Sequence, residues 1–450
     1  MAKYKAYSEY KDSGVEWLGE IPVHWSLKKA KYIFQKIQRP PRHIDGVVTA
    51  FRDGQVTLRT NRRIDGFTNS VKEIGYQGVR NGDLMIHAMD GFAGAIGISD
   101  SDGKCSPVNS VCIPWKKQPV NIHFYGYLVR QLAVTDFILS LAKGIRERST
   151  EFRFSEFSAL FLAIPSKDEQ DKIVVFLKHE TKKIDNLIDK QQQLIELLKE
   201  KRQAVISHAV TKGLHPDVPM KDSGVKWLEE IPSHWKMKRL AYLGSARNGL
   251  TYSPENITDQ ESGVLVLRSS NIQNLNLCFD DNVYVNINIP EQFLVKENDL
   301  IICSRNGSRN LIGKNALINK DSEGMAFGAF MAIFRSQINR YIFWVLNSPL
   351  FDYQSGSFLT STINQLTIGN LKSMEVPIPP LKEQKQIELY LSEINNKFIE
   401  LINKIDNSIT LLQERRTALI SAAVTGKIDV RHWHAPNEQS QTTAETEAAV

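Results

Sequence analysis

Two long stretches of the chain carry apolar residues at nearly every seventh position. Steps of seven from the first of these give Leu177, Ile184, Gln191, Leu198 and Val205, and the second stretch gives Leu391, Phe398, Ile405, Leu412 and Leu419. A second row is supplied by Leu187, Leu194, Ile394 and Leu401, with Lys, Glu and Asp elsewhere. A period of seven with charged flanks is typical of a coiled coil. The pattern predicts two long helices that bury each other's apolar stripes; the alternative is two amphipathic helices that each pack on their own domain.

Both stretches have start and stop signals of helices. Ser166 and Glu169 form a potential capping box, and Pro379–Pro380 precede the second helix. Gly213 and Gly426 lie where the helices should end. At 1.5 Å per residue, about 45 helical residues would span roughly 65–70 Å.

The same order of segments occurs twice. KDSGVEWLGEIPVHW at residues 11–25 matches KDSGVKWLEEIPSHW at residues 221–235 at 12 of 15 positions. The helical stretches repeat at an offset of 214, because IPSKDEQDKI begins at Ile164 and IPPLKEQKQI begins at Ile378. Two units of roughly 210 residues are too long for solenoid repeats, so the chain is predicted to be a tandem duplication.

Two divergent middles lie between the repeated segments. Short apolar runs at 83–89, 263–270 and 299–305 have strand length and flanking Gly, Asn or Asp, and an apolar segment of helix length stands near the end of each middle. These features predict a mixed α/β (α+β) fold for both middles. The predicted division is a leading segment (1–25), first middle (26–163), first long helix (164–213), linker and second leading segment (214–235), second middle (236–376), second long helix (377–427) and a polar, disordered tail (428–450).

The charge is distributed unequally between the two middles. The first carries 20 Lys and Arg against 12 Asp and Glu, whereas the second carries 13 against 12. The basic excess of the first middle indicates a polyanionic partner.

Composition excludes several other classes of protein. With 450 residues and 42% apolar content, the chain can bury two or more cores. No apolar run reaches the length of a membrane span, and the N-terminus lacks the apolar core of a signal peptide, so we expect a cytoplasmic protein with no membrane partner. The four cysteines form no C-x-x-C pair, which argues against a disulfide or zinc framework.

Motifs of catalysis fail on their spacing. GFAGAIG at 91–97 is not followed by a helix pattern, and NGSRNLIGKN at 306–315 has the wrong glycine spacing and lacks the Ser or Thr of a phosphate-binding loop. No Asn/Asp-Pro-Pro-aromatic, H-E-x-x-H or G-x-S-x-G sequence is present. We therefore expect no catalytic residue, cofactor or metal in this chain.

The repeated His-Trp pairs, His24–Trp25 and His234–Trp235, are interpreted as packed residues that seat each middle on its helix. The alternative for the tryptophans is a platform on which bases stack.

The repeated blocks resemble the DNA-specificity subunit of type I restriction–modification enzymes. The resemblance is carried by DSGVEWLGEIPVHW, DSGVKWLEEIPSHW, IPPLKEQ, AVISHAVT and ALISAAVT, and it extends from about Lys11 to Lys427. In the middles, NGDLMIHAMDGFAG and ENDLIICSRNGSRN look like the strand and glycine-containing loop of the family's target-recognition domains, which suggests that both middles share one fold. The first unit departs from the pattern at 166–168, where Ser-Lys-Asp replaces Pro-Pro-Leu.

The resemblance implies two target-recognition domains held apart by an antiparallel coiled coil with a pseudo-two-fold axis. It implies that the chain is not an enzyme but acts with double-stranded DNA, two methyltransferase subunits and restriction/translocase subunits. S-adenosylmethionine would be bound by the methyltransferase partner, and ATP and Mg by the restriction partner. Since the scaffold is duplicated while the readers differ, we expect a target of two unlike half-sites with a fixed spacer.

Basic side chains in loops are the candidates for DNA contact, because arginine bonds to guanine or phosphate and asparagine bonds to adenine. The candidates are Arg59, Arg62, Arg63, Arg146, Arg148 and Arg153 in the first middle, and Arg268, Asn271, Arg305 and Arg309 in the second. Two other functions stay open at this point: an adaptor whose middles bind protein, and a nuclease or methyltransferase with unrecognised motifs.

Overall fold

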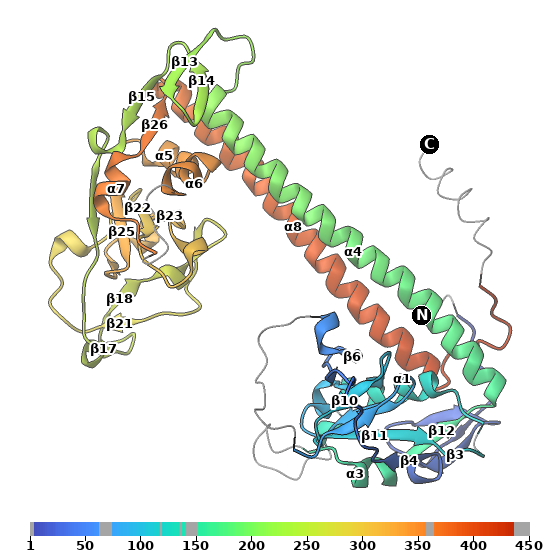
Figure 1. Cartoon of the computed structure of the whole chain (residues 1–450). Coiled ribbons are helices and arrows are strands. Elements are labelled where there is room, and N and C mark those ends of the chain that lie inside the picture. Colours follow the sequence, from blue (N-terminus) through green and yellow to red (C-terminus); the bar gives the residue numbers. More distant parts are fainter. Residues whose placement is uncertain are drawn as a thin grey trace. The chain divides into compact units, whose positions relative to one another are not determined.

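The computed structural model describes residues 4–62, 74–117, 119–135, 137–140, 151–356 and 364–435. The chain divides into two compact units: unit 1 is Met1–Gln191 with Asn407–Val450, and unit 2 is Gln192–Asp406. Each unit contains one mixed α/β domain and one end of each long helix, α4 (Lys167–Lys212) and α8 (Leu381–Val424) (Figure 1).

A four-stranded antiparallel sheet forms the centre of the domain in unit 1. Its strand order is β4-β11-β8-β9. These strands are β4 (Phe34–Ile37), β8 (Leu84–His87), β9 (Ile96–Ile98) and β11 (Asn109–Pro114). Around them lie β1 (Tyr10–Asp12), β2 (Glu20–Pro22), β3 (Ser26–Lys29), β5 (Val48–Ala50), β6 (Val56–Leu58), β7 (Gln77–Val79), β10 (Gly103–Cys105), β12 (Phe161–Ile164), α1 (Ile122–Val134), α2 (Phe137–Ser140) and α3 (Phe154–Ala159).

The domain in unit 2 contains a sheet of the same design. Its order is β16-β25-β22-β23, again antiparallel, formed by β16 (Ser245–Asn248), β22 (Leu300–Cys303), β23 (Asn315–Leu317) and β25 (Met331–Arg335). Its other elements are β13 (Met220–Val225), β14 (Leu228–Pro232), β15 (Lys236–Arg239), β17 (Ile257–Thr258), β18 (Val264–Leu267), β19 (Ile272–Gln273), β20 (Asn276–Leu277), β21 (Tyr284–Val285), β24 (Ala326–Phe327), β26 (Glu375–Ile378), α5 (Asn339–Leu346), α6 (Pro349–Gly356) and α7 (Ile368–Ser373). The expectation that the two middles share a fold is confirmed for this sheet.

Each domain is tied to its long helix by a two-stranded ladder. β3 pairs with β12 in unit 1, and β15 pairs with β26 in unit 2. The strand that follows the His-Trp pair therefore lies beside the strand that leads into the long helix. This pairing brings together the two repeated segments of each unit, although the whole middle separates them in sequence.

The two long helices pack antiparallel in both units. In unit 1 the first half of α4 shares a buried core with the last turns of α8, including Leu177 and Leu419. In unit 2 the last turns of α4 share a core with the first half of α8, including Val210 and Leu391. The predicted pairing is confirmed, and the alternative of two helices that pack only on their own domains is wrong.

The predicted first core row is confirmed. Leu177, Ile184, Leu391, Phe398 and Leu419 are buried, and Gln191, Leu198, Val205, Ile405 and Leu412 are half-buried. Both helices also end as predicted, α4 immediately before Gly213 and α8 two residues before Gly426, and both glycines have the positive φ of a helix C-terminus, 78° and 75°.

The predicted second row is wrong for three of its four residues. Leu187, Leu194 and Leu401 are 44–47% exposed, and only Ile394 packs partly against the core. The inner row instead contains Ile188 and Ile195. At about 100° per residue, an offset of three lies about 60° to one side of the first row and an offset of four lies about 40° to the other. Apolar residues stand on both flanks, so tertiary packing decides which flank faces the partner helix.

Candidate nucleic-acid interface

A buried joint built on a glutamate positions each domain on its long helix. In unit 1, Trp25 Nε1 donates to Glu169 Oε1 over 3.1 Å, and His24 Nε2 lies 3.0 Å from Glu169 Oε2. In unit 2, Trp235 Nε1 and His234 Nε2 lie 3.0 and 2.8 Å from Glu383 Oε2. Both tryptophans are 0% exposed. The interpretation as packed joints is confirmed for Trp25 and Trp235, for which the stacking-platform alternative is wrong, whereas His24 and His234 bond to the glutamate but are 39% and 42% exposed.

The predicted capping box is formed only in part. Glu169 N donates to Ser166 Oγ over 3.3 Å, as such a box requires. The Glu169 carboxylate bonds instead to Trp25 and to Tyr7, whose hydroxyl donates over 2.5 Å. The side chain that would complete the cap therefore serves the joint.

A buried aspartate precedes the central strand of each domain. Asp83 accepts two bonds from the Arg39 guanidinium, of 2.9 and 3.2 Å. Burial raises the pKa of Asp83, against the effect of the paired arginine. Asp299 accepts two bonds from Arg335, of 2.7 and 2.5 Å. The sequence repeats the aspartate but not its partner, since the arginine follows β4 in one domain and ends β25 in the other.

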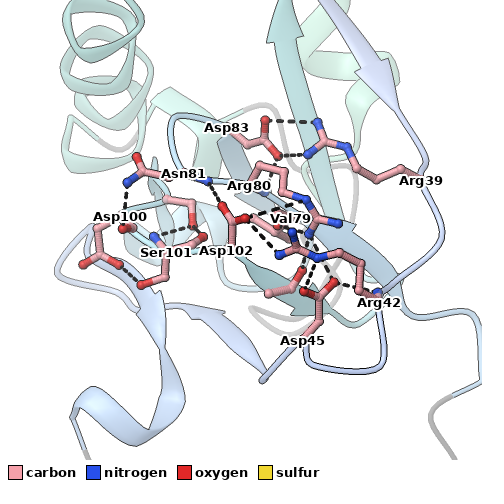
Figure 2. Close-up of polar contacts among 12 residues, drawn as sticks. Arg39, Arg42, Asp45, Val79, Arg80, Asn81, Asp83, Asp100, Ser101 and Asp102 are labelled. Carbon is pink, nitrogen blue, oxygen red and sulfur yellow. Dashed lines mark hydrogen bonds and ion pairs between the residues drawn. The ribbon is translucent and has the colours of Figure 1, made fainter.

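Figure 2 shows a cluster of aspartates and arginines in unit 1 that extends from the Arg39–Asp83 pair. Arg42 bonds to Asp45 and Asp102, both over 2.9 Å, and Arg80 Nη1 lies 3.1 Å from Asp45 Oδ2. The Asp45 side chain is 1% exposed. Arg42 and Arg80, like Arg39, are therefore paired with carboxylates, although the Arg42 side chain itself is 43% exposed. The cluster fixes the loop after β4 and the turn before β10, and these arginines already have carboxylate partners.

Three of the six candidates of unit 1 lie within the described residues. Arg62 stacks over the Phe51 ring at 4.2 Å and pairs with Asp53 at 2.7 Å, and the neighbouring Arg59 donates to Thr49 Oγ1 over 3.4 Å. Arg153 pairs with Glu151 at the start of α3. Arg63, Arg146 and Arg148 lie outside the described residues.

The structure brings two candidates of unit 2 into one groove of about 1240 Å³. Arg305 lies 5.3 Å from the centre of the Phe330 ring, which is 59% exposed, and in the described part of the chain the guanidinium has no carboxylate partner. Arg268 pairs with Asp281 at 2.9 Å on the same groove. Arg309 is exposed at the start of the short 3-10 helix Arg309–Leu311, a few residues after Arg305. We call this feature the Arg305 groove.

Two further residues of the Arg305 groove carry no basic charge and were missed by sequence reasoning. Gln365 forms an isolated antiparallel bridge with Arg305, so an amide side chain stands next to the guanidinium. Tyr252 also lines the groove. In the sequence, the groove was indicated only by Phe330, an aromatic residue that stands between two short strands in FGAF.

Asn271 is corrected as a candidate for base contact. It is 0% exposed, and its amide donates to Cys278 O, Asp281 O and Asn282 Oδ1 over 3.0–3.2 Å. Its Oδ1 accepts from the backbone N–H of Arg268. All of its hydrogen-bonding groups are used inside the loop, so the side chain holds Arg268 in place and cannot read a base.

Comparison with known proteins agrees with this architecture. The family model for the type I restriction modification DNA specificity domain matches residues 232–411. The putative type I restriction enzyme MjaX specificity subunit of Methanocaldococcus jannaschii is 22% identical over 442 residues, which cover 92% of this chain and 96% of the relative. Residues 232–411 therefore match the DNA specificity domain of type I restriction–modification systems, and nearly the whole chain is similar to a specificity subunit of these systems.

Other comparisons extend this assignment. The type I restriction enzyme EcoKI specificity subunit of Escherichia coli K12 is 25% identical over 206 residues, and the match spans 44% of each protein. A solved structure from a study of complex assembly and conformational transition of the type I R-M system covers 91% of this chain and 99% of its own chain, with a TM-score of 0.70 and 15% identity. Its likeness shows the fold. Within the described residues, no helix is both long and apolar enough to cross a membrane.

Proposed function

We propose that this specificity subunit reads an asymmetric DNA target of two half-sites, one for each domain. The observation that carries the proposal is a repeated frame with unequal surfaces. The sheet order and the buried joint occur in both units, whereas the arginine-bearing surfaces do not correspond. A reader that repeated its surface would read a palindrome, because identical domains related by a two-fold axis present identical contacts.

The two surfaces suggest different means of reading. Unit 1 presents Arg62, which is stacked on Phe51 and tethered by Asp53, in a middle with net charge +8, from 20 basic and 12 acidic residues. Unit 2 presents the Arg305 groove in a middle with net charge +1, from 13 and 12. Because each phosphate contact adds about 0.9 to the salt slope, unit 2 must rely more on base contacts than on phosphate contacts.

We propose that the paired helices set the spacer between the half-sites. Each helix runs through both units without a break, α4 for 46 residues and α8 for 44. A continuous helix has a fixed rise per residue, so its length is a natural measure of distance.

We also propose that the helices carry two equivalent docking faces for two methyltransferase subunits. Exposed apolar residues recur at the offset of the repeat, in the pairs Val175/Leu389, Leu187/Leu401 and Leu197/Leu411, all 47–69% exposed. An exposed apolar residue that is retained in both copies of a duplicated scaffold is best accounted for by a partner that covers both. In this proposal the methyltransferase partner binds S-adenosylmethionine and methylates adenine, and restriction subunits with ATP and Mg carry out cleavage in the cytoplasm.

A domain exchange tests the division of labour. Replacing residues 26–163 by the first recognition domain of another specificity subunit should change one half-site of the methylated motif and leave the other intact. A change in both half-sites, or in neither, would contradict one reader per domain. An adaptor whose middles bind protein would give no sequence-selective, salt-sensitive DNA binding in the presence of the methyltransferase.

A further inference from the structure

Unit 1 contains a groove of about 760 Å³ between its domain and the paired helices. It is lined by α1, with Arg130 and Tyr127, and by the loop at Gly54 and β9. It is also lined by α4 and α8, with Asp185 and Arg416. We call it the Arg130 groove. Its volume lies in the range of sites that hold a nucleotide-sized ligand, about 300–1,000 Å³.

Arg130 is a cation without an ion pair among the described residues of this groove. Among the described residues its Nε is buried without a hydrogen-bond partner, and its guanidinium has no ion pair. Burial, and then the nearby Arg416, lower the pKa of Arg130. The guanidinium lies on the backbone at Gly54, where a Cβ would approach Nε to 2.3 Å. A glycine at position 54 is thus what lets the cation lie there.

The carboxylates of the groove already have partners. Asp185 is bound by Arg416 over 2.7 and 3.4 Å, and Asp53 is bound by Arg62 over 2.7 Å. Neither carboxylate forms an ion pair with Arg130, although Asp53 is near enough to raise its pKa. Around Arg130 lie groups that can donate hydrogen bonds, including the Tyr127 hydroxyl, whose pKa is raised by burial. An unpaired guanidinium with neutral donors beside it suits an oxyanion.

Unit 2 does not repeat these groups, although it repeats the frame around them. The helices α1 and α5 align through Tyr125 and Tyr341, whose hydroxyls donate to Ala163 O and Pro377 O, two carbonyls at the 214-residue offset. In this register Gly126, Tyr127 and Arg130 correspond to Ile342, Phe343 and Leu346, which are all buried. On α4 and α8, Asp185 corresponds to Ile399. Gly126, Tyr127, Arg130 and Asp185 are thus replaced by apolar residues in unit 2, whereas Arg416 is retained as Arg202.

This contrast argues against a role in holding the frame together. The frame of unit 2 forms the same sheet, joint and helix pair with apolar residues at these positions. Burying an unpaired charge costs free energy, so a cation that the frame does not need is best explained by a ligand.

We propose that the Arg130 groove binds a phosphate group, either of a nucleotide-sized ligand or of the DNA backbone, with Arg130 as its principal contact. Phosphate matches the guanidinium in geometry and offers several acceptor oxygens to the neighbouring donors. The DNA form of this proposal rests on the proposed function, whereas the nucleotide form does not.

Variants that copy unit 2 into unit 1 provide the test. Arg130→Leu introduces the residue found in the corresponding place of α5, and Tyr127→Phe removes one hydroxyl only. Arg202→Leu is the matched control, because Arg202 is the counterpart of Arg416, its Nε is also buried without a partner among the described residues, and it lies in unit 2. All three variants carry an apolar side chain at the changed position, and circular dichroism checks that they fold.

Calorimetry of the full chain with inorganic phosphate and with adenosine monophosphate, at constant ionic strength, tests the free ligand. Wild type and Arg202→Leu should bind, Tyr127→Phe should bind a few-fold more weakly, and Arg130→Leu should lose about tenfold or more, as expected for a charged hydrogen bond. To test a contact with the DNA backbone, the affinity of the complex with the methyltransferase for target DNA is measured at several salt concentrations, which gives the slope of log affinity against log salt concentration. Arg130→Leu should lower the slope by about 0.9, with an unchanged motif.

Each outcome is decisive. Loss of phosphate or nucleotide binding supports a free ligand, and a lower salt slope alone supports a backbone phosphate. No binding by wild type together with an unchanged slope overturns the proposal, as does an equal loss in Arg202→Leu. Failure of the proposed function is seen separately, as the absence of a methylated motif with the wild-type chain.

Discussion

Replacing Arg305 by alanine should relax reading at one base pair of the half-site assigned to unit 2. The Arg305 guanidinium has no carboxylate partner in the described part of the chain and lies 5.3 Å from the centre of the Phe330 ring, so its donors are free for the O6 and N7 of a guanine. A bidentate contact of this kind contributes about 1–3 kcal/mol of discrimination, or roughly 5- to 150-fold between the right and the wrong base. Removing the stack by Phe330→Ala should cost less, about 0.5–1 kcal/mol for an exposed cation–π contact.

The assay is methylation mapping in cells that express each variant with the methyltransferase, followed by competition binding with oligonucleotides changed at single positions. Arg239→Ala is the control, because this exposed arginine of unit 2 pairs with Glu375 at 3.2 Å and lies outside the Arg305 groove. The reasoning is refuted if Arg305→Ala weakens binding equally on all sequences, which is the behaviour of a phosphate contact. It is also refuted if the affected base lies in the half-site that follows residues 26–163 in a domain exchange.

Three other predictions concern the frame. Glu383→Ala leaves the indole N–H of the buried joint without its acceptor and should lower the free energy of unfolding by about 1–3 kcal/mol in chemical denaturation. Leu401→Lys should weaken binding of one methyltransferase subunit, and Leu187→Lys should weaken binding of the other. The double variant should therefore bind neither subunit in analytical ultracentrifugation. Binding by the double variant equal to that of the wild type would exclude these docking faces. Inserting seven residues after Gln191 and after Asp406 keeps the inner rows in phase and should lengthen the spacer by about 3 base pairs, from 10.5 Å of added rise, as read by methylation mapping.

The frame was predictable because it leaves two kinds of signal in the sequence. The period of seven residues identified the helices and the first core row, and the tandem repeat identified the segments that form the joints. The second row was not predictable, because Leu187 and Ile188 are both apolar and the sequence does not say which side of α4 meets α8. The glutamate of the joint was missed for a related reason. Glu169 fits a capping box in sequence, and only the pairing of β3 with β12 brings Trp25 to its carboxylate.

The candidate interface was predictable only as far as residue type. Counting arginines identified Arg305 but also Arg42 and Arg80 as positive charge, and only the folded domain shows that the latter two are paired with Asp45. The prediction for Asn271 was wrong because the residue type does not distinguish an exposed asparagine that reads a base from a buried asparagine that holds a loop. Long-range contacts decide between exposure and burial, and they are not encoded in local composition.

The central claim is that two unlike domains on a duplicated frame read two unlike half-sites. Single-molecule sequencing of DNA methylation, in cells that express this chain with its methyltransferase and no other, tests the claim most directly. The account predicts one methylated motif made of two different short sequences, separated by a spacer of constant length, with one modified adenine on each strand. A palindromic motif, a continuous motif without a spacer, or no motif at all would contradict it.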